Sequence, residues 1–115
     1  MSDLIVLRDR MRQFTDERGW ARFHDPKSLA LALVGEVGEL AELLQWLPAD
    51  AAREALLQEP LSTRVAEEIS DILIYLIRLA DVLDVDLAQA ASLKLAAADA
   101  RFPADEVFDS APMKT

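Results

Sequence analysis

Residues 31–46 read LALVGEVGELAELLQW, the pattern of a buried helix that carries charges on its apolar face. At about 100° of rotation per residue, Glu36 falls in the middle of an apolar stripe, and Glu39 lies one turn further on at its edge. The apolar members of this stripe are Leu29, Leu33, Leu40, Leu43 and Leu47. Burying two adjacent ionised carboxylates is unfavourable unless a proton, a basic partner or a metal ion compensates them. The stretch therefore predicts a long helix with a compensated acidic pair.

A second acidic pair lies in residues 67–76, EEISDILIYL, where Glu68 and Asp71 repeat the three-residue spacing. Apolar residues occupy most of the remaining circumference, so this helix should also be enclosed. If the two helices face each other, the pairs converge into an oxygen-rich cluster of the kind that suits Mg²⁺, with Mn²⁺ as a substitute. The predicted metal ligands are Glu36, Glu39, Glu68 and Asp71.

Neither acidic pair by itself requires magnesium. Pairs of acidic residues are common on exposed helix faces, and here they could pair with Arg22, Arg64 or Arg78 in a noncatalytic helical oligomerisation or regulatory module. That alternative stays open. A carboxylate di-iron bundle usually needs Glu-x-x-His on two helices, and we reject it because the only histidine, His24, lies in a predicted loop.

The rest of the chain predicts an all-α fold, a four- to five-helix bundle, because Ala and Leu dominate and only three glycines occur among 115 residues. We expect helices over residues 3–18, 26 to about 47, part of 48–60, 62 or 63 to about 83, and 87 to about 101. The expected capping residues are Asp25 for the second helix, Ser62 or Thr63 for the fourth and Asp86 for the last. We predict one domain over residues 1–103 and a loosely ordered tail over 104–115. Apolar surface on several helix sides predicts a homo-oligomer, and a homotetramer is the favoured form.

The charge balance limits the partners. The chain carries 21 acidic and 12 basic residues, a formal net charge of −9, which disfavours a nonspecific grip on a nucleic acid polymer or an anionic membrane. A polyanionic substrate would need a cation between itself and the protein. Because the sequence has no cysteine, no export signal and no run of ~18 apolar residues, we expect a soluble cytoplasmic protein.

Taken together, the two quoted runs resemble the MazG-like all-α nucleoside triphosphate pyrophosphohydrolases, most of all their dCTP pyrophosphatase branch, from about residue 4 to Pro103. The resemblance implies a MazG-like bundle that assembles as a dimer or tetramer. It also implies Mg²⁺-dependent hydrolysis of (d)NTPs, dCTP-like or noncanonical, to monophosphate and pyrophosphate, a house-cleaning of the nucleotide pool. The four carboxylates would be the catalytic metal ligands. Related pyrophosphates such as phosphoribosyl-ATP or dUTP are alternative substrates.

The resemblance further implies substrate contacts from Trp20, His24, Trp46, Tyr75, Lys94 and Arg101. The tryptophans and His24 would lie around base and sugar, and Tyr75 would approach the substrate from the second metal helix. The two basic side chains would meet phosphate charge. From the residues alone, the tryptophans could instead be core or interface anchors, His24 a capping or surface residue, and the basic pair a complement to a helix dipole.

One departure concerns base recognition. Ala98 stands where relatives typically have Asn, Asp99 and Ala100 occupy the following, usually basic, positions, and Phe102 replaces the usual Tyr. The loss of an amide that can pair with a base edge weakens a prediction of strict cytosine specificity.

Overall fold

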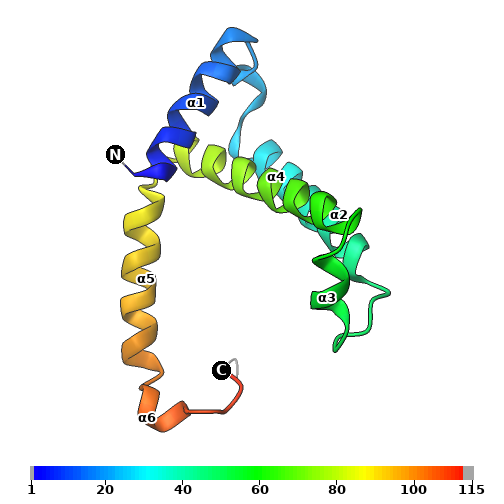
Figure 1. Ribbon diagram of the computed structural model, residues 1–115. Coiled ribbons are helices and arrows are strands. Elements are labelled where there is room, and N and C mark those ends of the chain that lie inside the picture. Colours follow the sequence, from blue (N-terminus) through cyan, green and yellow to red (C-terminus); the bar gives the residue numbers. More distant parts are fainter. Residues whose placement is uncertain (1, 113–115) are drawn as a thin grey trace. The chain divides into compact units, whose positions relative to one another are not determined.

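The computed structural model describes residues 2–112, and every regular element in this range is helical (Figure 1). The elements are α1 (Asp3–Glu17), the 3₁₀ helix η1 (Ala21–Phe23), α2 (Pro26–Leu44), α3 (Ala52–Leu56), α4 (Leu61–Val82), α5 (Leu87–Arg101) and α6 (Ala104–Val107). The described residues contain no β-strand, which confirms the predicted all-α class. None of these helices combines the length and apolar character that crossing a membrane requires.

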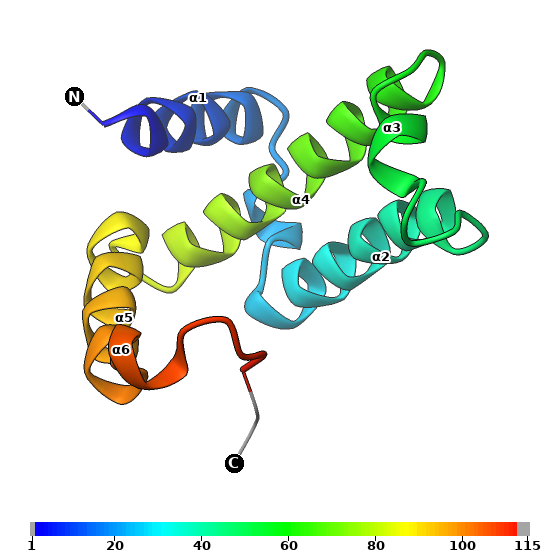
Figure 2. The same cartoon turned by 60° about the horizontal axis from the view of Figure 1, so that its bottom comes forward.

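The chain divides into two compact units, the first ending at Val85 and the second beginning at Asp86. In the first unit, α2 and α4 run side by side in opposite directions (Figure 2). The buried apolar residues Leu29, Ile77 and Ala80 belong to the start of α2 and the last turns of α4. The antiparallel arrangement brings these two ends together, and α1 packs against the same helix α4. The core of the first unit is therefore small.

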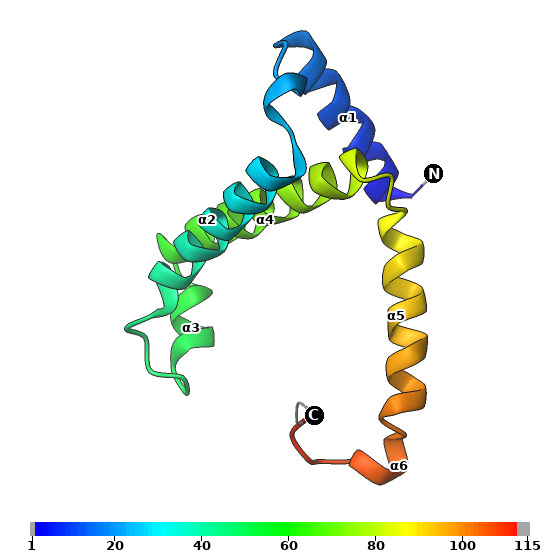
Figure 3. The ribbon, with the colours of Figure 1, turned by 180° about the vertical axis from the view of Figure 1, so that it is seen from behind.

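Large apolar side chains remain exposed on both long helices. On α2, Leu31 and Val34 are 62% and 66% exposed, and on α4 the exposed set is Ile69, Leu73, Ile74, Leu76 and Leu83. Figure 3 shows the same pair of helices from behind. The apolar stripe that the sequence places on α4 is thus not covered within the first unit.

Two of the predicted helix starts are confirmed in detail. The Asp25 carboxylate accepts hydrogen bonds from the backbone N–H and hydroxyl of Ser28, at 2.9 and 2.7 Å, directly before α2. The Asp86 carboxylate accepts from the backbone N–H of Gln89 at 3.1 Å, directly before α5. In each case a short carboxylate satisfies a helical N–H that has no partner within the helix.

The predicted start of α4 is wrong. The helix begins at Leu61, so Ser62 and Thr63 lie inside its first turn instead of capping it. Their hydroxyls donate to the Glu59 carboxylate at 2.6 and 2.7 Å. A hydroxyl that donates to an upstream carboxylate is not accepting from the helix N–H groups, which is what a capping residue must do.

The first residues of the predicted tail form a short helix. Residues 104–107 form α6, and only residues 113–115 of the tail lie outside the described residues. The boundary between the compact units, after Val85, does not coincide with our boundary after residue 103, and that division of the chain stays a prediction.

Candidate metal centre

Three carboxylates converge between the two long helices of the first unit. One oxygen each of Glu36, Glu39 and Glu68 lie within 4.8 Å of one another. The three-residue spacing places the first two on one face of α2, and the antiparallel packing of α4 brings Glu68 to them. Asp71, the fourth predicted ligand, is not part of this close group, although its negative charge contributes to raising the pKa of both Glu36 and Glu68.

The cluster is electrostatically uncompensated. Burial raises the pKa of the Glu36 and Glu68 carboxyls above their usual range, and the neighbouring Glu39 carboxylate raises both further. Although both side chains as a whole are only half-buried, the Oε2 atom of each is shielded from solvent and has no hydrogen-bond partner within residues 2–112. A shielded carboxylate oxygen without a donor requires a proton or a cation for stability.

Two of the three arginines that could have neutralised the cluster are engaged elsewhere. Arg78 donates to His24 and Asp81, and the guanidinium of Arg22 lies 4.5 Å above the Phe23 ring. The charge of Arg64 lowers the pKa of Glu68, but by less than burial raises it. No ion pair within residues 2–112 includes any of the four carboxylates. The donor set is all oxygen and anionic, which fits a hard divalent cation.

The two tryptophans are not core anchors. Trp46 is 86% exposed in the turn after α2. Trp20 is 45% exposed and packs edge-to-face on Phe14, with ring centroids 5.8 Å apart. The guanidinium of Arg18 also lies over the Phe14 ring, 3.7 Å from its centroid. Each tryptophan therefore exposes indole surface on which a base could stack.

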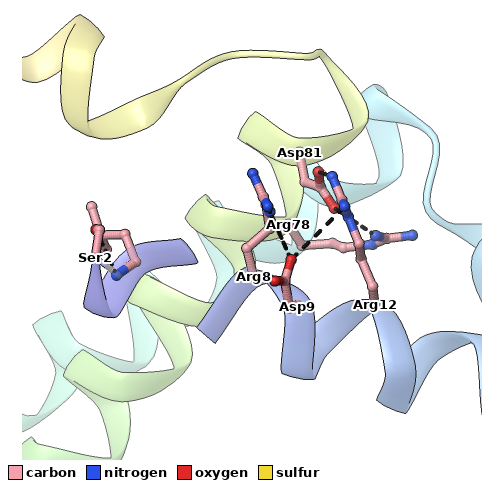
Figure 4. Close-up of polar contacts among 7 residues, drawn as sticks. Ser2, Arg8, Asp9, Arg12, Arg78 and Asp81 are labelled. Carbon is pink, nitrogen blue, oxygen red and sulfur yellow. Dashed lines mark hydrogen bonds and ion pairs between the residues drawn. The ribbon is translucent and has the colours of Figure 1, made fainter. Parts of the chain in front are cut away.

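His24 belongs to a polar network that the sequence did not reveal. The Arg78 Nε–H donates to His24 Nδ1 at 3.0 Å, and Arg78 Nη1 donates to Asp81 Oδ2 at 3.2 Å. From α1, the guanidinium of Arg12 donates to both Asp81 oxygens at 2.8 and 2.5 Å (Figure 4). The only local signal for this network is the three-residue spacing of Arg78 and Asp81, because its other members come from distant segments.

The remaining predicted site residues are distributed over both units. Tyr75 is half-buried on α4, one turn after Asp71. Lys94 and Arg101 are exposed on α5 of the second unit, about two turns apart and thus on one helix face. The guanidinium of Arg101 lies 5.1 Å from the Phe102 ring centroid.

An open hollow of about 620 Å³ lies on the first half of α4 beside Asp71. It is lined by Glu59, Ser62, Thr63, Ala66, Glu67, Ser70 and Asp71. Every lining residue comes from α4 or the two residues before it, so the hollow is a surface depression and not a closed binding pocket.

Comparison with known proteins agrees with the resemblance seen in the sequence. Residues 24–104 match the family described as the MazG nucleotide pyrophosphohydrolase domain. The chain is 47% identical over 91 residues to dCTP pyrophosphatase 1 of Bos taurus, covering 79% of this chain and 54% of that protein. Its identity to dCTP pyrophosphatase 1 of Homo sapiens is 45% over 92 residues, covering 80% and 54%. The chain therefore spans about half the length of the curated relatives it matches.

A solved structure is similar over nearly its whole length. A pyrophosphatase from Archaeoglobus fulgidus superposes with a TM-score of 0.82 at 36% identity, covering 90% of this chain and 94% of that one. The region that matches the family includes the four carboxylates, His24 and Lys94 but excludes Trp20.

Proposed function

The chain belongs to the MazG nucleotide pyrophosphohydrolase family, and we propose that it hydrolyses nucleoside triphosphates at the α–β phosphoanhydride bond. Water adds to the α-phosphorus, the bond to the bridging oxygen breaks, and the products are a monophosphate and pyrophosphate. The observation that carries this proposal is the cluster of Glu36, Glu39 and Glu68, with two shielded oxygens that have no hydrogen-bond partner among the described residues.

The metal ligands in this proposal are Glu36, Glu39, Glu68 and Asp71, and the ion is Mg²⁺ or, as a substitute, Mn²⁺. When bound, the ion would offset the negative charge of the triphosphate and polarise the reacting phosphoryl group. The carboxylates hold their positions because they project from two packed helices and not from loops. Because burial and mutual repulsion raise the pKa of Glu36 and Glu68, these groups gain the most from a nearby cation.

The other predicted site residues divide between the base and the phosphates. Trp20 and Trp46 offer exposed indole surface for stacking, and His24 and Tyr75 offer polar groups to the base or sugar. Lys94 and Arg101 offer positive charge to the phosphates. The favoured substrates are dCTP-like or noncanonical dNTPs, in a house-cleaning role in the cytoplasm, because the curated relatives carry the name dCTP pyrophosphatase 1 while Ala98 lacks an amide for strict cytosine recognition.

A Mg²⁺-dependent pyrophosphate-release assay tests this proposal. The substrates are the four dNTPs, the rNTPs, dUTP, phosphoribosyl-ATP and several base-modified dNTPs. We expect release that requires Mg²⁺ and that Glu39→Gln reduces by at least about a hundredfold, since the substitution removes one charged ligand. Glu42→Gln, an exposed carboxylate one turn further along α2, is the matched control and should retain activity.

Two results would overturn the proposal. A folded wild-type protein that releases no pyrophosphate from any of these substrates would favour a noncatalytic helical module. Equal loss in the Glu39→Gln and Glu42→Gln proteins would mean that the clustered carboxylates have no special part in the reaction.

A further inference from the structure

We propose that Arg78 is a positioning residue that fixes His24 as a neutral imidazole with its proton on Nε2. The ring then offers one neutral N–H donor to a ligand and no positive charge. That the ligand is a nucleotide rests on the proposed function. The protonation state of the His24 ring does not depend on it.

The proton position follows from the contact between the two side chains. A guanidinium carries only donors, so a ring nitrogen that receives its N–H must present a lone pair. Arg78 Nε donates to His24 Nδ1 at 3.0 Å, which assigns the lone pair to Nδ1 and the remaining proton to Nε2. Protonation of Nδ1 would set two N–H groups against each other and place two positive charges in contact.

Asp81 holds Arg78 in this contact, and Arg12 on α1 in turn holds Asp81. Arg78 is buried, and the Asp81 side chain is 8% exposed. The Asp81 carboxylate accepts from Arg78 at 3.2 Å and, in a bidentate arrangement, from Arg12 of α1 at 2.8 and 2.5 Å (Figure 4). Bidentate guanidinium–carboxylate pairs fix orientation as well as distance. The Arg12–Asp81 pair therefore limits the positions open to Arg78.

Burial of the ring, followed by the charge of Arg78, also disfavours the protonated imidazole and lowers the pKa of His24 below its usual range. Asp81 on α4 faces the guanidinium of Arg78, Asp9 on α1 lies beside Arg12, and the adjacent Asp25 directs its carboxylate to Ser28. No carboxylate thus pairs with the imidazole in the described residues, and the ring is neutral at pH 7.

A neutral donor narrows the ligand chemistry of His24. A protonated histidine would suit phosphate oxygens, whereas a neutral Nε2–H suits a carbonyl or hydroxyl oxygen. Within the proposed nucleotide site, His24 therefore contributes a hydrogen bond but no positive charge, and the charge of the triphosphate falls to the metal and the basic residues.

The experiment is ¹⁵N NMR of the imidazole, measured as a pH titration on the full chain. His24 is the only histidine in the sequence, so its two nitrogen signals need no assignment by mutation. We expect the wild-type ring to be the Nε2–H tautomer with a pKa below 6.5. In Arg78→Leu, which removes the donor and its charge but leaves the ring partly buried, the pKa should rise while staying below the usual range, and the tautomers should mix.

A second pair of variants keeps the test decisive if Arg78→Leu does not fold. Arg12→Gln, at an exposed position, leaves Asp81 less neutralised and should raise the pKa of His24 by a smaller amount. Arg10→Gln on the same helix is the matched control and should leave both nitrogen signals unchanged. A wild-type ring that carries its proton on Nδ1, or a pKa that neither Arg78→Leu nor Arg12→Gln raises, would overturn the proposal.

Kinetics separate this inference from the proposed function. If pyrophosphate is released, Arg78→Leu should raise KM roughly fivefold, the factor for one lost hydrogen bond, with a smaller effect on kcat. An effect confined to kcat would contradict the assignment of a substrate-binding hydrogen bond to His24. If the wild type releases no pyrophosphate, the proposed function fails while the NMR result still decides the role of Arg78.

Discussion

At the residue scale, the carboxyls of Glu36 and Glu68 link the candidate metal centre to folding. Each has a raised pKa in the folded state, so each contributes stability that is present below its unfolded pKa of about 4.5 and is lost as the pH rises through the folded value. These two groups therefore make the metal-free protein less stable at pH 7 than at mildly acid pH, whereas the lowered pKa of His24 acts in the opposite direction. Bound Mg²⁺ should reverse this trend because the cation favours the ionised carboxylates.

We predict that Glu36→Gln raises the Tm of the metal-free protein at pH 7, because it removes one member of a repelling group. The same substitution should abolish most of the increase in Tm that Mg²⁺ gives the wild type. Thermal unfolding with a chelator and with excess Mg²⁺, from pH 5 to pH 8, measures both effects. Glu42→Gln provides the control. A lower metal-free Tm in Glu36→Gln would mean that the carboxylate has a stabilising partner in the protein.

The residues of the site differ in how far the sequence could predict them. Glu36 and Glu39 stand out because a charge on an apolar helix face is anomalous within one short window. The contacts of Arg12, Arg78 and His24 bring together segments up to 69 residues apart, and no local period encodes such a pairing. Asp81 resembles an ordinary surface acid in the sequence, because only the tertiary fold buries it between two arginines.

At the element scale, the helix starts were predictable where the cap is a local motif. Asp25 and Asp86 each precede the first turn of a helix, whose N–H groups have no acceptor within the helix. Each carboxylate accepts a hydrogen bond from the backbone N–H three residues later. The start of α4 was missed because the Ser62 and Thr63 hydroxyls have Glu59 as a competing acceptor. A Ser or Thr cap can therefore be identified from sequence only when no nearby carboxylate accepts a hydrogen bond from its hydroxyl.

We predict that Asp86→Ala destabilises the protein by about 1 kcal/mol, because it removes the only side-chain acceptor at the start of α5 in the described structure. Asp86→Asn should cost much less, since the Asn carbonyl caps equally well. Urea unfolding followed by circular dichroism gives both free energies of unfolding. Equal losses in the two variants would indicate that the charge at this helix end matters and not the hydrogen bond.

At the scale of the whole molecule, the small core limits how much apolar surface a single chain can bury. The fold buries few large apolar residues, while both helices that carry the carboxylates expose apolar side chains to solvent. The sequence predicted that both helices would be enclosed, but it could not say which apolar side chains would be covered within one chain, because helical periodicity does not distinguish a core from an interface. We therefore propose that the protein is a homo-oligomer, a dimer or a tetramer, in which neighbouring chains cover α2 and α4.

We predict that Val34→Lys weakens this assembly by roughly a hundredfold, because an unpaired ammonium would enter an apolar interface at a loss of about 3 kcal/mol. Val34 is 66% exposed in the single chain, so the substitution should leave the folded protomer intact. Light scattering across a dilution series should give a mass of two or four chains for the wild type and a smaller mass for the variant. Gln13→Lys, which adds the same charge on α1, should assemble normally. A wild-type mass of one chain, or equal assembly of Val34→Lys, would mean that the exposed face of α2 has another use.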